Sequence, residues 1–170
     1  MGMPRRLILM RHAKSSWKQE AATDHERCLN RRGRRDAPRI ARELRRLGWW
    51  PDLVLSSDSQ RTRETWELMS AETDPPTAAR FSNQLYLAGL DEIEEVVRQV
   101  PNRVSTLLVL GHNPGWEEAA SVLSGVECEM TTGNCALLES EYLQWHGSCS
   151  VQAGWRLVDM LRPRALESGY

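Results

Sequence analysis

Four residues able to bind or attack a phosphoryl group each lie shortly after an apolar run of the sequence. They are Arg11, His12, Arg61 and His112. The runs that precede them are 7–10, 53–55 and 107–110. Short apolar runs bounded by turn-forming residues are typical of buried strands, and ligands of open α/β sheets bind at the carboxyl ends of such strands. The spacing therefore predicts a phosphoryl-transfer site in which one imidazole is the nucleophile.

Arg11, directly before His12, favours His12 as that nucleophile. A guanidinium binds a phosphate dianion through a fork of donors and keeps its charge at any working pH. The same charge favours the neutral imidazole, and only the neutral ring has a lone pair with which to attack phosphorus. An Arg-His pair alone is a weak motif, because a histidine that follows a strand is more often structural.

Arg61 and His112 are the candidates for holding the phosphate oxygens. Arg61 stands where a strand hands over to a helix, whose first N–H groups are free and whose dipole favours anions. His112 lies in the sequence Gly-His-Asn-Pro-Gly, where small and turn-forming residues allow a ligand to approach the backbone closely. Each motif is unspecific in isolation, and their common placement after strands is what supports the site.

The composition is that of an ordinary soluble globular protein, and the length predicts a single domain over residues 1–170. The chain is 41% hydrophobic and 26% charged with a net charge of −1, so bulk charge does not point to nucleic acid. The four cysteines show no metal-ligand spacing and are expected to be free thiols. Neither a signal peptide nor an apolar stretch of membrane-spanning length is present, so we expect a cytoplasmic protein without membrane contact, as a monomer.

The hydrophobic periodicity alternates between strand and helix. The predicted strands are 6–10, 52–56, 80–82, 106–110, 135–139 and 155–161. The predicted helices are 30–47, 59–71, 91–100 and 115–124, the first with Asn30 as N-cap and the third capped by Asp91. Pro38 predicts a kink or a later start in the first helix. This order predicts a three-layer α/β fold, with a mostly parallel central sheet covered by helices on both faces.

With these motifs together, the chain resembles the histidine phosphatase (phosphoglycerate mutase-like) superfamily, and most closely its short SixA-like phosphohistidine phosphatase branch. The segments that carry the resemblance are 11–15, 27–33, 51–57, Arg61-Thr62, Leu85-Tyr86, 111–115 and 131–133. The resemblance covers essentially the whole chain. It implies that His12 is phosphorylated during the reaction and that Arg11, Arg61 and His112 complete the phosphate pocket, with no metal and no cofactor.

Further residues are expected to contact the substrate. They are Lys14, Ser15, Asn113 and Gln84. Trp17 is placed to line the rim of the site. Many superfamily members have a carboxylic acid after the third strand that protonates the leaving group, and our alignment puts Gln84 there. Because glutamine cannot deliver a proton, we expect good turnover only of substrates whose leaving group departs easily, such as phosphohistidine.

The arginines of segment 31–46 recur at helical spacing opposite its apolar stripe. Such a run is most often a solvated helix face, and the alternative is a docking surface for an acidic phosphoprotein.

Three functions remain open at this point. The first is a phosphatase acting on a phosphorylated protein or a small phosphorylated substrate. The second is a phosphomutase, against which the missing acid and the missing cap insertion count. The third is a non-catalytic phosphoprotein-binding module, which would keep the pocket and release no phosphate.

Overall fold

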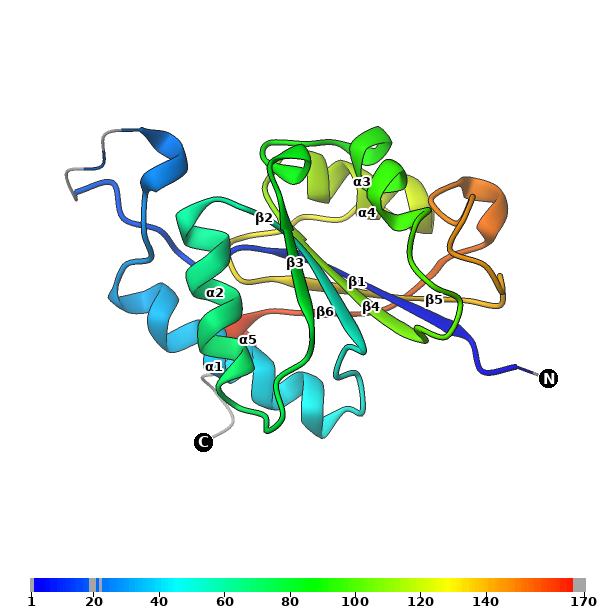
Figure 1. Ribbon diagram of the computed structural model, residues 1–170, viewed down its shortest axis with the longest axis horizontal. Coiled ribbons are helices and arrows are strands. Elements are labelled where there is room, and N and C mark those ends of the chain that lie inside the picture. The colour runs from blue at the N-terminus through cyan, green and yellow to red at the C-terminus, as the bar shows by residue number, and fades with distance from the viewer. Residues whose placement is uncertain (1, 19–20, 22, 167–170) are drawn as a thin grey trace.

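The structure is a computed structural model that describes residues 2–18, 21 and 23–166. Within these residues, six strands form one mixed sheet in the order β3-β2-β4-β1-β5-β6 (Figure 1). The strands are β1 (Arg5–Arg11), β2 (Leu53–Ser57), β3 (Ala79–Ser82), β4 (Thr106–Gly111), β5 (Cys135–Ser140) and β6 (Arg156–Leu161). Strands β3, β2, β4 and β1 pair in parallel, whereas β5 runs antiparallel to both β1 and β6. The predicted mostly parallel α/β sheet is confirmed.

Helices cover both faces of this sheet (Figure 1). The α-helices are α1 (Arg31–Arg46), α2 (Gln60–Ser70), α3 (Leu90–Val97), α4 (Gly115–Ser124) and α5 (Pro163–Leu166). The described residues also form three single turns of 3₁₀ helix, η1 (Asp24–Glu26), η2 (Asn83–Leu85) and η3 (Val151–Ala153). No helix of the described residues is long and apolar enough to cross a bilayer.

The side chains of β1 alternate between two buried cores, as the pleat of a strand requires. Leu7 and Leu9 join the core beneath α3 and α4, whereas Ile8 and Met10 join the core beneath α1 and α2. Because both faces of β1 are covered, the strand is apolar at every one of these positions. Its carboxyl end is therefore held rigidly where the first candidate site residues follow.

Helix α1 begins as the sequence predicts. The side-chain oxygen of Asn30 accepts a 2.9 Å hydrogen bond from the N–H of Gly33 and so satisfies one of the free donors of the first turn. The helix continues through Pro38 to Arg46, so the proline neither delays its start nor ends it.

Helix α3 begins differently from the prediction. Gly89, not Asp91, is its N-cap, and the carboxylate of Glu92 accepts a 2.9 Å hydrogen bond from the Gly89 N–H. The first turn is therefore satisfied by a side chain that reaches back from inside the helix, and the predicted cap was two residues too late.

Candidate active site

Register places the two histidine motifs at the same edge of the sheet. In the parallel pairing of β1 with β4, Arg11 lies opposite Gly111, and the His12 N–H donates to the Gly111 carbonyl at 3.0 Å. The next strand, β2, ends beside β4 with Ser56 opposite Leu110. The ends of these three strands therefore lie side by side at one edge of the sheet, as the sequence predicts.

A turn after α4 fixes the backbone of Arg11 and His12. The N–H of Gly133 lies 3.1 Å from the Arg11 carbonyl oxygen and 2.9 Å from the His12 carbonyl oxygen, and donates to both. Gly133 has φ of +81°, a left-handed conformation that a residue with a side chain rarely adopts. The backbone of His12 is therefore fixed by hydrogen bonds to Gly111 on one side and to Gly133 on the other.

The imidazole of His12 is buried and its tautomer is set by the backbone. Its Nδ1 lies 2.7 Å from the carbonyl oxygen of Ala13, which can only accept, so Nδ1 carries the proton. The lone pair is then on Nε2, which accepts a 3.3 Å hydrogen bond from Nε of Arg61. Burial, to which the neighbouring His112, Arg61 and Arg11 add, outweighs the hydrogen bond to Ala13 and holds the pKa of His12 well below its usual value. The ring is neutral, and Nε2 is the ring nitrogen that carries the lone pair.

His112 stands beside His12, with the two ring centroids 5.3 Å apart. Its Nδ1 lies 3.4 Å from Nη2 of Arg61, and its Nε2 lies 2.8 Å from Oγ of Ser57. Because a guanidinium only donates, Nδ1 is the accepting nitrogen and Nε2 donates to Ser57. Burial and the charge of Arg61 lower the pKa of His112 to about 3. Both imidazoles are thus neutral and both meet the same arginine.

Arg61 is 2% exposed and is held by the turn η1 as well as by the histidines. Its Nη1 donates to the carbonyl oxygen of Asp24 at 2.7 Å, and its Nη2 donates to the Asp24 carboxylate at 3.0 Å. The same carboxylate accepts from the hydroxyl of Tyr86 and from Nε of Arg27. Burial raises the pKa of Asp24, but the hydrogen bonds from Tyr86, Arg61 and Arg27 outweigh it, so this pKa lies well below the usual range. Asp24 is ionised at neutral pH.

Arg11 approaches the cluster from the end of β1. Its Nη1 donates to the Met130 carbonyl at 3.0 Å, and its buried Nε–H has no hydrogen-bond partner in the described residues. A buried donor without a partner costs about 1–3 kcal/mol, which an anionic ligand would recover. Burial lowers the pKa of Arg11.

The sequence reasoning missed Asp24, Ser57 and Tyr86 as members of the site. The ring of Tyr86 packs edge-on against His112 with centroids 5.3 Å apart, and the Ser57 hydroxyl accepts from Nε2 of His112 at 2.8 Å. Ser57 and Tyr86 lie in segments that carry the family resemblance, so the sequence contained a signal that could have identified them. Asp24 lies in a polar loop, and nothing in its local spacing indicates that it meets Arg61.

Ser15 and Asn113, both expected to bind substrate, are engaged by the protein's own groups. Ser15 is buried and its hydroxyl accepts from Arg27 Nη1 at 2.9 Å. The Asn113 amide donates to the Met130 carbonyl at 2.8 Å and so braces the segment that Arg11 also contacts. Ser15 is linked to the site through Arg27, and Asn113 is linked to it through the Met130 carbonyl that Arg11 also contacts. Both side chains therefore help to position the site residues.

Lys14 and Gln84 lie outside the cluster around Arg61. Lys14 lines a neighbouring cavity of about 830 Å³. Gln84 is exposed and lines a separate cavity of about 220 Å³, with residues of β3 and α3 such as Arg80 and Val96. The structure therefore does not bring Gln84 to the histidines, and the side chain at this position is not placed to protonate a leaving group there.

The histidine phosphatase superfamily (branch 1) is the family whose sequence model matches this chain, over residues 7–104. Together with the site, this match shows that the chain belongs to that superfamily. The fold is the phosphoglycerate mutase-like α/β fold found in SixA structures.

Individual proteins and solved structures are similar to this chain over most of its length. An uncharacterised chloroplastic protein of Arabidopsis thaliana is 40% identical over 170 residues, covering 94% of this chain and 78% of its own. An uncharacterised protein of Mycobacterium tuberculosis is 38% identical over 117 residues, 69% of this chain and 71% of its own. A candidate phosphohistidine phosphatase SixA from Nakamurella multipartita superposes with a TM-score of 0.81 at 30% identity, over 95% of this chain and 98% of that one. A second candidate SixA, from Agrobacterium tumefaciens, gives 0.79 at 25% identity over 95% and 100%.

Proposed function

We propose that this chain is a phosphatase that cleaves phosphohistidine and other phosphoryl groups with good leaving groups, through a phosphorylated His12. The observation that carries the proposal is the 2.7 Å hydrogen bond from His12 Nδ1 to the Ala13 carbonyl, which leaves a lone pair on Nε2 beside Arg61. The similarity to SixA structures supports phosphohistidine as the substrate class.

In the first step, Nε2 of His12 attacks phosphorus in line with the leaving group. A bond forms between phosphorus and Nε2 while the bond to the leaving group breaks. A phosphohistidine substrate whose second ring nitrogen is protonated departs as neutral imidazole, so it takes no proton from a side chain. Nδ1 of His12 keeps its proton, which remains hydrogen-bonded to the Ala13 carbonyl. The ring phosphorylated at Nε2 is therefore positively charged and is a good leaving group for the second step.

Arg11, Arg61 and His112 hold the three equatorial oxygens during this transfer. The dianion recruits the guanidinium of Arg61 and the buried Nε–H of Arg11. Its charge also raises the pKa of His112 from about 3, so that Nδ1, the nitrogen on the Arg61 side, can take a proton and donate. Because the arginines supply the positive charge, the reaction needs neither metal nor cofactor.

In the second step, water attacks phosphorus and the bond to His12 breaks. Inorganic phosphate leaves, the electron pair returns to Nε2, and the proton lost by water passes to solvent. The neutral imidazole is restored for another turnover.

Hydrolysis of p-nitrophenyl phosphate, with and without EDTA, tests this function. Wild-type protein should turn over at the same rate in EDTA, and radiolabelled substrate should leave an acid-labile, base-stable label on the protein. His12→Ala should lose at least about three orders of magnitude in turnover while still binding phosphate. Label that persists on His12→Ala would rule out His12 as nucleophile, and binding without any phosphate release by wild type would identify a binding module.

A further inference from the structure

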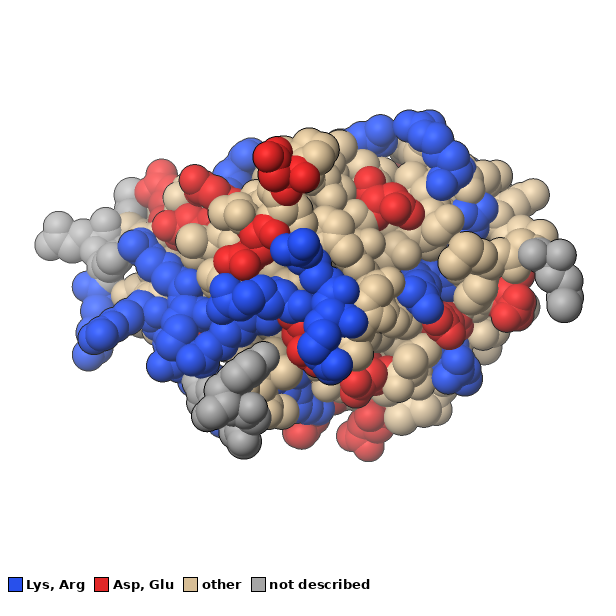
Figure 2. Space-filling model, turned by 90° about the horizontal axis from the view of Figure 1, so that it is seen from below, with Lys and Arg blue, Asp and Glu red and all other residues tan. Residues whose placement is uncertain are grey.

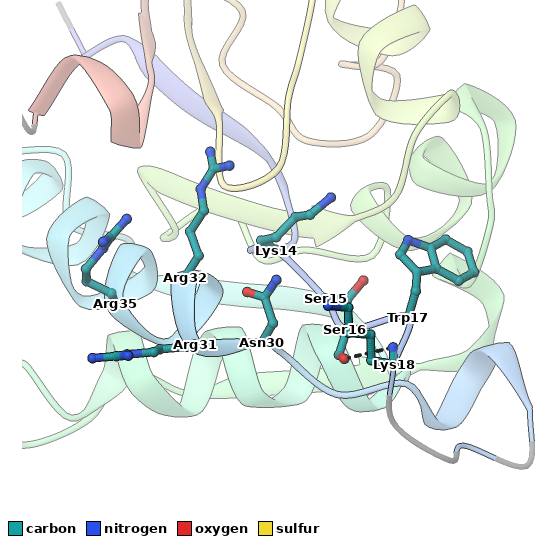
Figure 3. Close-up of a pocket in the computed structure, with 9 residues that line it drawn as sticks. All are labelled: Lys14, Ser15, Ser16, Trp17, Lys18, Asn30, Arg31, Arg32 and Arg35. Carbon is teal, nitrogen blue, oxygen red and sulfur yellow. Dashed lines mark hydrogen bonds between the residues drawn. The ribbon is translucent and has the colours of Figure 1, made fainter.

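A basic groove opens beside the proposed phosphate site, between the loop after β1 and the start of α1 (Figure 3). It has a volume of about 830 Å³. Its nine described lining residues include five cations and no carboxylate. They are Lys14, Ser15, Ser16, Trp17, Lys18, Asn30, Arg31, Arg32 and Arg35.

The walls of the groove are held together by backbone contacts. The Asn30 N–H donates to the Lys14 carbonyl at 3.0 Å, and the Ser16 N–H donates to the Cys28 carbonyl at 2.9 Å. A Cβ on Gly33 would lie 2.2 Å from the Lys14 carbonyl oxygen, so only glycine lets the helix approach the loop this closely. The groove is therefore a formed feature of the fold.

The positive charge of the groove continues along α1. This helix contains eight arginines and two carboxylates, a net formal charge of +6 in a chain whose total is −1. Three of those arginines share the one buried carboxylate of Asp36, with N–O distances of 3.4 Å, 3.6 Å and 3.8 Å. Seen from below, Lys and Arg side chains form a broad patch over the face on which α1 lies (Figure 2).

This arrangement does not favour the stability of the fold. The first turn of α1 contains no acidic residue, although the partial positive charge of a helix N-terminus favours acids and disfavours cations there. Arg31 and Arg32 nevertheless occupy that turn and line the same groove as Lys14 and Lys18 of the loop, with the Arg31 side chain pointing away from the loop (Figure 3). Cations gathered at an unfavourable position indicate an anionic ligand.

The groove is physically connected to the site. Ser15, on its wall, accepts from Arg27, and Arg27 also donates to the Asp24 carboxylate that holds Arg61. The guanidinium of Arg27 stacks 3.5 Å from the ring of Trp17, an exposed side chain at one end of the groove. An anionic segment in the groove would thus lie next to a phosphoryl group bound at His12.

We propose that this groove and the outer face of α1 dock an acidic segment of a phosphorylated protein substrate. This inference rests on the proposed phosphatase function. The sixteen residues of α1 extend about 24 Å at 1.5 Å per residue. About seven residues of an extended peptide, at roughly 3.3 Å each, cover this length. A small phosphoester is too short to do so. The sequence pI of about 6.4 argues against nucleic acid, whose binding domains are typically strongly basic.

Two phosphohistidine peptides test the docking site, one flanked by Asp and Glu and one in which these are Asn and Gln. At low salt, wild-type kcat/KM should be about tenfold higher for the acidic peptide, and added salt should reduce the difference. Arg31→Glu combined with Lys18→Glu should abolish the preference and leave hydrolysis of p-nitrophenyl phosphate within about twofold of wild type. Arg98→Glu combined with Arg103→Glu, the same charge change at two exposed positions that do not line the groove, should retain the preference.

Binding of the unphosphorylated acidic peptide, followed by fluorescence anisotropy, separates docking from catalysis. Docking predicts Arg31-dependent binding even in His12→Ala. Because Arg31→Glu places an acid in the first turn of α1, this variant should fold with an unchanged or higher Tm. Equal kcat/KM of wild type for both peptides would overturn the docking site and leave the proposed phosphatase function intact. If wild type binds the acidic peptide but hydrolyses neither phosphopeptide, the phosphatase function alone would be overturned. Arg31-dependent binding of an RNA oligonucleotide in preference to the peptide would overturn the choice of partner.

Discussion

The Asp24 carboxylate accepts a 3.0 Å hydrogen bond from Nη2 of Arg61, the same nitrogen that lies 3.4 Å from Nδ1 of His112. An anion of the protein itself thus occupies a donor of the guanidinium proposed to bind phosphate. Tyr86 and Arg27 also donate to this carboxylate, so phosphate must compete with a well-held internal partner.

Asp24→Asn should therefore strengthen inhibition by inorganic phosphate. The amide oxygen can still accept from Arg61, but the competing charge is gone, so the inhibition constant should fall by roughly three- to tenfold, as for a weak, partly exposed ion pair. Inhibition of p-nitrophenyl phosphate hydrolysis measures this constant. Glu26→Gln removes an exposed acid from the same turn and is the matched control. An unchanged or higher constant in Asp24→Asn would assign Asp24 to positioning Arg61 only.

Removing Arg61 or His112 should lower turnover by roughly two to three orders of magnitude, the usual loss for one transition-state donor. Arg61→Lys should recover little, because an ammonium cannot reproduce a fork that meets Asp24 and both histidines at once. Single-turnover rates with p-nitrophenyl phosphate measure the loss. Near-wild-type rates in Arg61→Ala would remove this residue from the site.

Stability should fall as the solution is acidified below neutral pH. The pKa of His112 is about 3 in the folded protein, against about 6.5 in an unfolded chain. Between these values the unfolded chain binds a proton that the folded chain does not. The free energy of unfolding therefore decreases as pH falls from about 6.5 towards 3, by at most about 1.4 kcal/mol per pH unit for each such histidine. The lowered pKa of His12 acts in the same direction.

Urea unfolding at pH 7, 6, 5 and 4 measures this dependence. His112→Gln should flatten the slope, whereas His146→Gln, at an exposed position, should leave it as in wild type. Parallel slopes for wild type and His112→Gln would show that His112 is not held neutral.

Rates should depend steeply on the pKa of the leaving group. In the described residues, Asp24 is the carboxylate bonded to Arg61, and its low pKa keeps it ionised and unable to donate a proton. Aryl phosphates and phosphoramidates should turn over well and simple alkyl phosphates barely. The measurement is kcat/KM across esters of graded leaving-group pKa, and a flat dependence would reveal an unrecognised acid. Gln84→Glu should leave the slope unchanged, because this side chain faces a different cavity.

The sequence by itself determined the elements of the sheet and the positions of its reactive residues. Continuous apolar runs predict strands buried on both faces, and apolar residues at a period of 3.6 predict helices with one buried face. The placement of Arg11, His12 and His112 at one sheet edge follows from local patterns alone, because the carboxyl ends of parallel strands meet there.

The tertiary structure decided what those residues contact. Asp24 meets Arg61 across 37 positions and Tyr86 across 62. No periodicity encodes contacts between a loop and two distant elements, so the internal competitor of phosphate was invisible in the sequence. Packing between distant parts of the chain likewise sets the tautomers of both histidines and keeps Gln84 outside the cluster around Arg61. It also forms the groove at the start of α1.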